Sequence, residues 1–68
     1  MKKRSLDKYT PDDISAIERR KSRVQRGTGP DAATGSFQQW LAQPNWGIIN
    51  WDDGYTSTVP LEELYVDG

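Results

Sequence analysis

The fold of this chain is decided by residues 46–59, which read WGIINWDDGYTSTV. The first part of this stretch, residues 46–51, is rich in β-branched and aromatic residues, which is the composition of a strand. The pair Asp53-Gly54 supplies the positive φ that a tight hairpin turn requires, and residues 55–59 suit the returning strand. The stretch therefore predicts an antiparallel β-hairpin.

The residues after the hairpin predict a short closing segment. Pro60 cannot donate to a ladder of hydrogen bonds, so the returning strand is expected to end there. Residues 61–64 predict a single helical or 3₁₀ turn, and residues 65–66 predict a short last strand.

The residues before the hairpin are less regular. Phe37, Trp40 and Leu41 recur at i, i+3 and i+4, which favours a helical turn, with a strand as the alternative. Residues 27–36 read GTGPDAATGS and combine Gly, Pro and small polar residues, which is typical of a linker or exposed loop.

Residues 47–67 resemble the last part of an SH3-like small β-barrel, a group that includes Tudor-type domains. The resemblance rests on GIINWDDG (47–54) and VPLEELYV (59–66), because in that group a Val-Pro step, a 3₁₀ turn and a short closing strand follow a hairpin. It implies five strands, so either residues 37–43 supply a missing strand or another chain completes the sheet. The tyrosine-bearing first-strand motif of signalling SH3 domains is absent, and recognition of proline-rich peptides is not implied.

A helix is predicted over residues 11–26. Thr10 is a suitable N-cap, Pro11 fits the first helical position, and Gly27 signals the end. The apolar stripe of this helix consists of Ile14, Ile17 and Val24. So few apolar side chains do not stabilise a short helix alone, and we expect it to dock on the C-terminal part, a second copy or a partner.

The charges are divided between the two ends of the chain. Residues 1–26 hold all nine basic residues and four acidic ones, giving +9 − 4 = +5, whereas residues 27–68 hold six acidic residues and no basic ones, giving −6. Most of the aromatic residues lie in the acidic part. The sequence therefore predicts an α+β chain with a basic helical arm (1–26), a Gly-rich linker (27–36) and an acidic, aromatic, SH3-like β domain (37–68).

Several kinds of chemistry are excluded by composition. The chain has no cysteine and no histidine, which removes thiolate metal sites and histidine-based catalysis. The adjacent carboxylate pairs, Asp52-Asp53 and Glu62-Glu63, are explained as turn residues and as the solvated side of a turn. We expect no enzyme activity, no cofactor and no metal. No apolar run suits a membrane span or a secretory signal, so a cytoplasmic protein is expected.

The basic arm carries the main functional signal. Arg19, Arg23 and Arg26 recur at i, i+4 and i+7, which on one long helix forms a ridge opposite the apolar stripe. Because arginine binds two phosphate oxygens at once, nucleic acid is the most specific partner, and an acidic protein surface, of this chain or another, is the alternative. Five phosphate contacts on duplex DNA predict a slope of about −4.5 for log affinity against log salt. The residues predicted to bind the anionic partner are Lys2, Lys3, Arg4, Arg19, Arg20, Arg23 and Arg26.

The tryptophans carry a second signal. Trp46 and Trp51 fall on opposite faces of one strand, so one is expected in the core and the other at the surface. Trp40 is expected in the core with Phe37 and Leu41. Exposed aromatic residues are favoured in protein interfaces, and the predicted protein-binding residues are Trp46, Trp51 and Tyr55. The rival functions are therefore a protein–protein adaptor or inhibitor and a structural subunit of a homo-oligomer, of a size common in phages, plasmids and bacteria.

Overall fold

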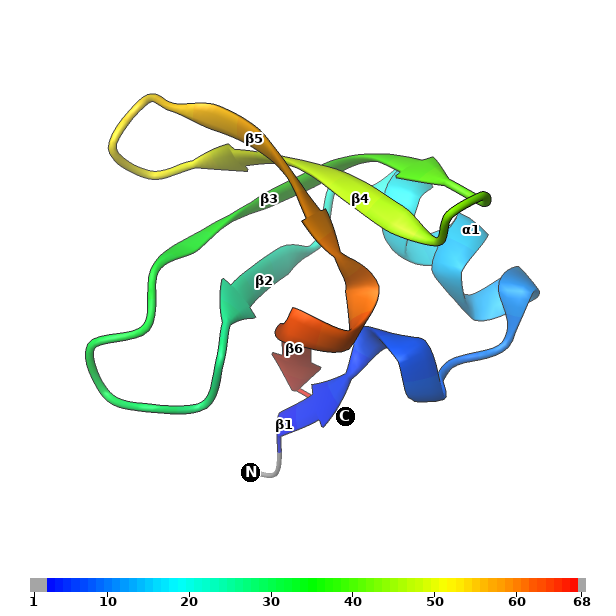
Figure 1. Cartoon of the computed structure of the whole chain (residues 1–68), viewed down its shortest axis with the longest axis horizontal. Helices are drawn as coiled ribbons and strands as arrows, with labels where there is room; N and C mark the ends of the chain where they lie inside the picture. Colours follow the sequence, from blue (N-terminus) through cyan, green and yellow to red (C-terminus); the bar gives the residue numbers. More distant parts are fainter. Residues whose placement is uncertain (1–2, 68) are drawn as a thin grey trace.

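One antiparallel sheet and one α-helix make up residues 3–67, which are the residues that this computed structural model describes (Figure 1). The strands are β1 (Lys3–Ser5), β2 (Arg23–Arg26), β3 (Thr34–Leu41), β4 (Trp46–Trp51), β5 (Thr56–Pro60) and β6 (Leu64–Asp67). The helix is α1 (Pro11–Arg20), and the two 3₁₀ turns are η1 (Leu6–Lys8) and η2 (Leu61–Glu63). The predicted α+β class is confirmed.

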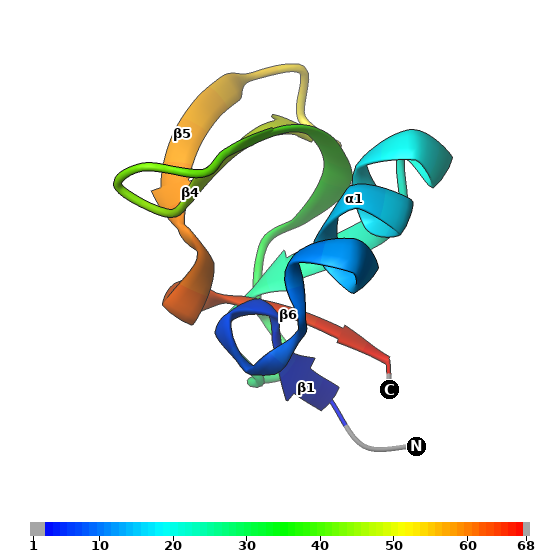
Figure 2. The same ribbon diagram turned by 90° about the vertical axis from the view of Figure 1, so that its right-hand side faces the viewer.

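The six strands follow the order β1-β6-β2-β3-β4-β5, and every neighbouring pair is antiparallel. The sheet curves strongly, and α1 lies beside β3 (Figure 2). Within residues 3–67 the two edge strands, β1 and β5, do not pair with each other, so the sheet is not closed.

The predicted hairpin is confirmed as β4 and β5. Ile49 lies opposite Ser57 in the centre of the pair, and Gly54 has the expected positive φ, 96°. The 3₁₀ turn after Pro60 is also present as η2, and the closing strand β6 begins at Leu64.

The predicted start of the helix is confirmed, but its predicted end at Arg26 is wrong. The Thr10 side chain accepts a hydrogen bond from the Asp13 N–H at 3.2 Å, and Pro11 is the first helical residue. The last residue of α1 is Arg20, six positions earlier than predicted.

A left-handed residue ends the helix. Lys21 has φ 51° and ψ 45°, and its N–H donates to the Glu18 carbonyl at 3.2 Å. The next N–H, of Ser22, donates to the Ile17 carbonyl at 3.2 Å, which completes a Schellman motif. A lysine therefore takes the role predicted for Gly27.

The residues predicted as the last turns of the helix form β2. Val24 is buried, with 3% of its surface exposed, and it lies opposite Gly35 of β3. On its other side β2 pairs with β6, where Gln25 lies opposite Tyr65. One buried β-branched residue between polar neighbours fits a period of two as well as a helical stripe, and pairing on both sides decides in favour of the strand.

The helical turn predicted around Phe37 is wrong, because these residues belong to β3. The register of β3 against β4 shifts between Phe37 and Gln39, so one extra residue is inserted there. As a result Phe37 is buried and Trp40, three positions later, also packs against the core. A bulged strand thus produces the spacing that is typical of a helix. Of the predicted linker, residues 34–36 belong to β3 as well.

Both charged segments contribute to one hydrophobic core. It consists of Leu6, Ile14, Val24, Phe37, Ile49, Val59, Leu61, Leu64 and Val66. The ring of Phe37 lies on the backbone of Gly47, where an added Cβ would stand 2.3 Å from the Phe37 Cε1 atom. Only glycine leaves room for the ring at this position.

Candidate anion-binding groove

The predicted ridge of arginines on one helical face is wrong, because Arg23 and Arg26 lie on β2 and not on α1. Both have acidic partners within the chain. Their contacts decide which cations are left for an outside ligand.

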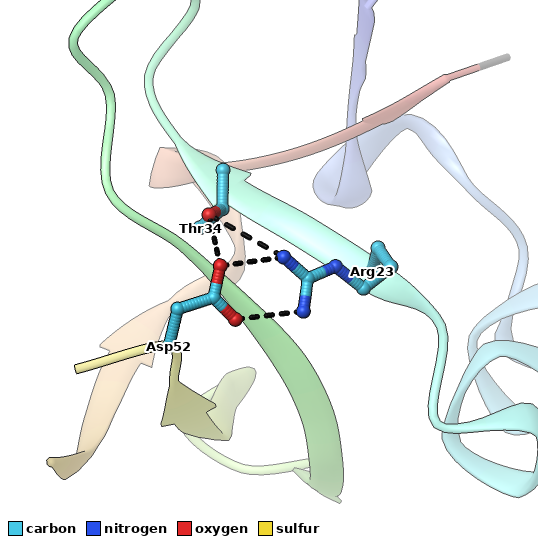
Figure 3. A network of polar contacts seen from close by, with 3 residues as sticks. All are labelled: Arg23, Thr34 and Asp52. Atoms are coloured by element: carbon cyan, nitrogen blue, oxygen red, sulfur yellow. Dashed lines mark hydrogen bonds and ion pairs between the residues drawn. The ribbon is translucent and has the colours of Figure 1, made fainter. Parts of the chain in front are cut away.

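Arg23 is held by Asp52 (Figure 3). Its two terminal nitrogens donate to the two carboxylate oxygens of Asp52 at 2.7 and 2.6 Å. The Thr34 hydroxyl donates to the same carboxylate at 2.5 Å, and the Asp52 N–H donates to the Thr34 carbonyl at 3.0 Å. The hydrogen bonds from Arg23 and Thr34 lower the pKa of Asp52 to about 2, and the contact with Asp52 raises the pKa of Arg23.

Arg26 is held by one carboxylate oxygen of Glu63. Its Nε and Nη2 atoms lie 3.0 and 2.9 Å from Oε1 of Glu63. The Gly27 N–H also donates to the Glu63 carbonyl at 3.0 Å. Two of the arginines predicted to bind an outside anion therefore form ion pairs with acidic residues of the C-terminal part of the chain.

Arg19 and Arg20 are exposed in the last turn of α1. Across residues 3–67, no hydrogen bond or ion pair holds either guanidinium group. Lys3 and Arg4 lie on β1, and the guanidinium carbon of Arg4 lies 5.0 Å from the centre of the Tyr9 ring. Lys2, also predicted to bind, lies outside the described residues.

A groove of about 280 Å³ lies beside Arg20. Its lining residues are Tyr9, Ile17, Arg20, Ser22, Arg23 and Val66, and we call it the Tyr9 groove. Arg20 and Arg23 stand at its wall, Arg4 lies over its aromatic ring, and none of its lining residues is acidic. The structure thus gathers three of the predicted anion-binding residues around one hollow.

Two polar residues that the sequence analysis did not single out join α1 to β3. The Trp40 N–H donates to the Glu18 carboxylate at 2.8 Å, and Lys21 Nζ donates to the Gln38 carbonyl at 3.1 Å. Both contacts satisfy the part of the β3 edge that β2 does not reach. The signal in the sequence was Glu18 itself, the single acid between residues 14 and 30.

The predicted protein-binding aromatics lie in different surroundings. Trp51 packs against the core, and its Nε1 donates to the Ser57 hydroxyl at 2.6 Å. Trp46 lies in register between Leu41 and Pro60, away from the core cluster. Tyr55 is 74% exposed in the hairpin turn. The structure does not bring the three together into one site.

Trp46 belongs to an apolar cluster on the outer face of the sheet. Residues directly opposite one another in antiparallel strands share a face, and Ile48 shares that face because it is two positions from Trp46. The outer cluster consists of Leu41, Trp46, Ile48 and Pro60, all half-buried. The prediction that Leu41 lies in the core is therefore wrong, because Leu41 shares the outer face with Trp46.

No group of three or more potential metal-ligating side chains is present in residues 3–67. The ten-residue helix α1 is too short and polar to cross a membrane, and the described chain has no other α-helix.

Comparison with models of protein families, with curated proteins and with solved structures finds no match to this chain.

Proposed function

We propose that this chain is a non-catalytic binding module that holds the phosphates of a nucleic acid at the Tyr9 groove. The observation that supports this function is a groove that is lined by Arg20 and Tyr9 and by no acidic residue, with Arg4 in contact with the Tyr9 ring. Arginine donors match phosphate oxygens in geometry as well as in charge. The Tyr9 ring packs against the core and lies under the Arg4 guanidinium group, which it helps to position.

The salt dependence of binding follows from the number of basic residues that have no acidic partner. Arg4, Arg19 and Arg20 are exposed and have no acidic partner in the described chain. Three phosphate contacts correspond to a slope of about −2.7 for log affinity against log salt on duplex DNA. This value replaces the steeper slope expected for five contacts, because two arginines are held by Asp52 and Glu63.

The sheet supports the finer proposal that residues 23–67 form an SH3-like unit. Strand β3 includes residues 37–41, which were the candidate for a missing strand, and β2 provides a further strand; β4, β5, η2 and β6 follow in the order that the resemblance implies. In this proposal α1 and β1 are additions at the N-terminal side that build the Tyr9 groove. We place the module in the cytoplasm, where nucleic acid is accessible.

Fluorescence anisotropy with labelled DNA and RNA of about 20 nucleotides, single- and double-stranded, tests this function, with salt varied from about 50 to 200 mM. The informative variant is Arg4→Ala/Arg20→Ala, and the matched control is Arg26→Ala, which removes an arginine held by Glu63. We expect the first to lose most of the affinity and the salt dependence and the second to bind like the unmodified protein. Absence of binding at about 50 mM salt, or equal losses for both variants, would contradict the proposal.

A second candidate function is self-association through the outer cluster, which would make the chain a structural subunit. The edge strand β5 reads TSTVP and carries no charge, and the outer cluster lies on β5 and the two strands next to it, β4 and β3. Such an edge can pair with a second copy. Sedimentation velocity at increasing concentration tests this function: the expected dimer should disappear in Trp46→Ala, and a monomer at every concentration removes the candidate.

A further inference from the structure

The Tyr9 groove has a second arginine whose donors are already occupied. Arg23 lines the groove together with Arg20, but its two terminal nitrogens are held by the two carboxylate oxygens of Asp52 at 2.7 and 2.6 Å. This two-point contact is the arrangement that arginine also makes with phosphate. Asp52 therefore presents to Arg23 the same pair of acceptors that a nucleic-acid backbone would present.

We propose that Asp52 is an intramolecular substitute for a phosphate group and competes with nucleic acid for Arg23. This inference rests on the proposed function of the Tyr9 groove. In the free protein Asp52 accepts hydrogen bonds from both terminal nitrogens of Arg23 and keeps other anions away from them. A backbone phosphate takes the two nitrogen donors only when the carboxylate of Asp52 turns to solvent, so Arg23 adds little to binding by the unmodified chain.

The pair is open to an outside competitor. The side chain of Arg23 is 63% exposed and that of Asp52 is 50% exposed. Exposed ion pairs contribute little to folding, so a phosphate can replace Asp52 without disrupting the sheet. The Thr34 hydroxyl also donates to the Asp52 carboxylate and favours the ion pair with Arg23. A phosphate therefore has to displace a carboxylate that both Arg23 and Thr34 hold.

The second ion pair of β2 provides a matched comparison. Arg26 and Glu63 are also exposed, at 52% and 43%, but neither residue lines the Tyr9 groove. Replacing Asp52 by Asn or Glu63 by Gln removes one negative charge and frees one arginine in each case. The two variants differ in whether the released arginine faces the groove.

The experiment measures binding of the same labelled nucleic acids to the full chain and to Asp52→Asn, Glu63→Gln, Arg23→Ala and Arg23→Ala/Asp52→Asn. We expect Asp52→Asn to bind more tightly and to steepen the salt slope by about 0.9, the value for one added phosphate contact. Between about 50 and 200 mM salt this change corresponds to about a threefold larger loss of affinity. The double variant should lose the gain, because the gain requires Arg23.

The outcomes separate this inference from the function on which it rests. If the unmodified chain binds but Asp52→Asn and Glu63→Gln have equal effects, net charge alone is responsible and the competition is overturned, while the groove function stands. A gain that persists in Arg23→Ala/Asp52→Asn overturns the competition as well. If no variant binds nucleic acid, both the function and the inference are overturned. A thermal unfolding curve for each variant shows that the compared proteins are folded.

Discussion

The carboxylate of Glu18 accepts the backbone N–H of Trp40 at 2.8 Å, and this contact joins the end of α1 to the part of β3 that β2 leaves unpaired. Trp40 is half-buried against the core, so its N–H has little access to water. The contact therefore fixes the helix that carries Arg19 and Arg20 relative to the sheet.

Replacing Glu18 by Ala should destabilise the fold by about 1–2 kcal/mol, because the Trp40 N–H then loses a charged acceptor. Glu18→Gln retains an oxygen acceptor and should cost less. Urea denaturation followed by tryptophan fluorescence measures both values. Equal stability of the unmodified chain and Glu18→Ala would show that the contact does not hold α1 in place.

Replacing Gly47 by Ala should cost about 1–3 kcal/mol, the range for overpacking a core. The new Cβ would stand 2.3 Å from the Phe37 Cε1 atom, so the ring or the strand has to move. Gly29→Ala is the control, because an added Cβ there has no heavy atom within 4 Å. Thermal unfolding should show a lower Tm for Gly47→Ala and little change for the control.

The stability of the fold should depend on the ionisation of Asp52. Its pKa is lowered from 3.8 to about 2, so the folded state binds the proton less tightly than the unfolded chain does. This contribution to stability is fully present above the unfolded value, and it is lost as the pH falls from about 4 through about 2. Denaturation curves at several pH values should show this loss in the unmodified chain and a smaller loss in Asp52→Asn.

Thr34→Val tests the cause of the lowered pKa of Asp52. The Thr34 hydroxyl donates to this carboxylate, and its removal takes away a hydrogen bond that favours the charged form. The pKa of Asp52 should therefore rise towards its usual value while the contact with Arg23 remains. A titration followed by the carboxyl carbon shift of Asp52 measures it, and an unchanged pKa would assign the whole effect to Arg23.

The parts of the fold that could be predicted from sequence are those fixed by neighbouring residues. The hairpin 46–60 depends on strand composition and on Asp53-Gly54, and the start of α1 depends on Thr10 and Pro11. Each of these signals acts over a few positions along the chain. They were therefore visible without knowledge of the tertiary structure.

The errors arose where distant contacts override local patterns. Val24 fits a helical stripe, but the pairing of β2 with both β3 and β6 makes it part of a strand. The bulge between Phe37 and Gln39 gives a strand the spacing of a helix.

The candidate site shows the same limit. The basic residues of the site could be identified from their residue types alone. The ion pair between Arg23 and Asp52, which lie 29 positions apart, depends on the fold. No local pattern in the sequence signals such a pair, so the sequence predicted five phosphate contacts, whereas the structure leaves fewer arginines available.

The proposed function of the Tyr9 groove is tested most directly by an NMR titration of the isotope-labelled chain with nucleic acid, followed by backbone amide and arginine side-chain signals. If the Tyr9 groove binds nucleic acid, the largest shifts should occur at Tyr9, Arg20 and Ser22, which line the groove. The signals of Arg26 and Glu63 should not shift. Shifts confined to the outer cluster around Trp46, or no shifts at low salt, would contradict it.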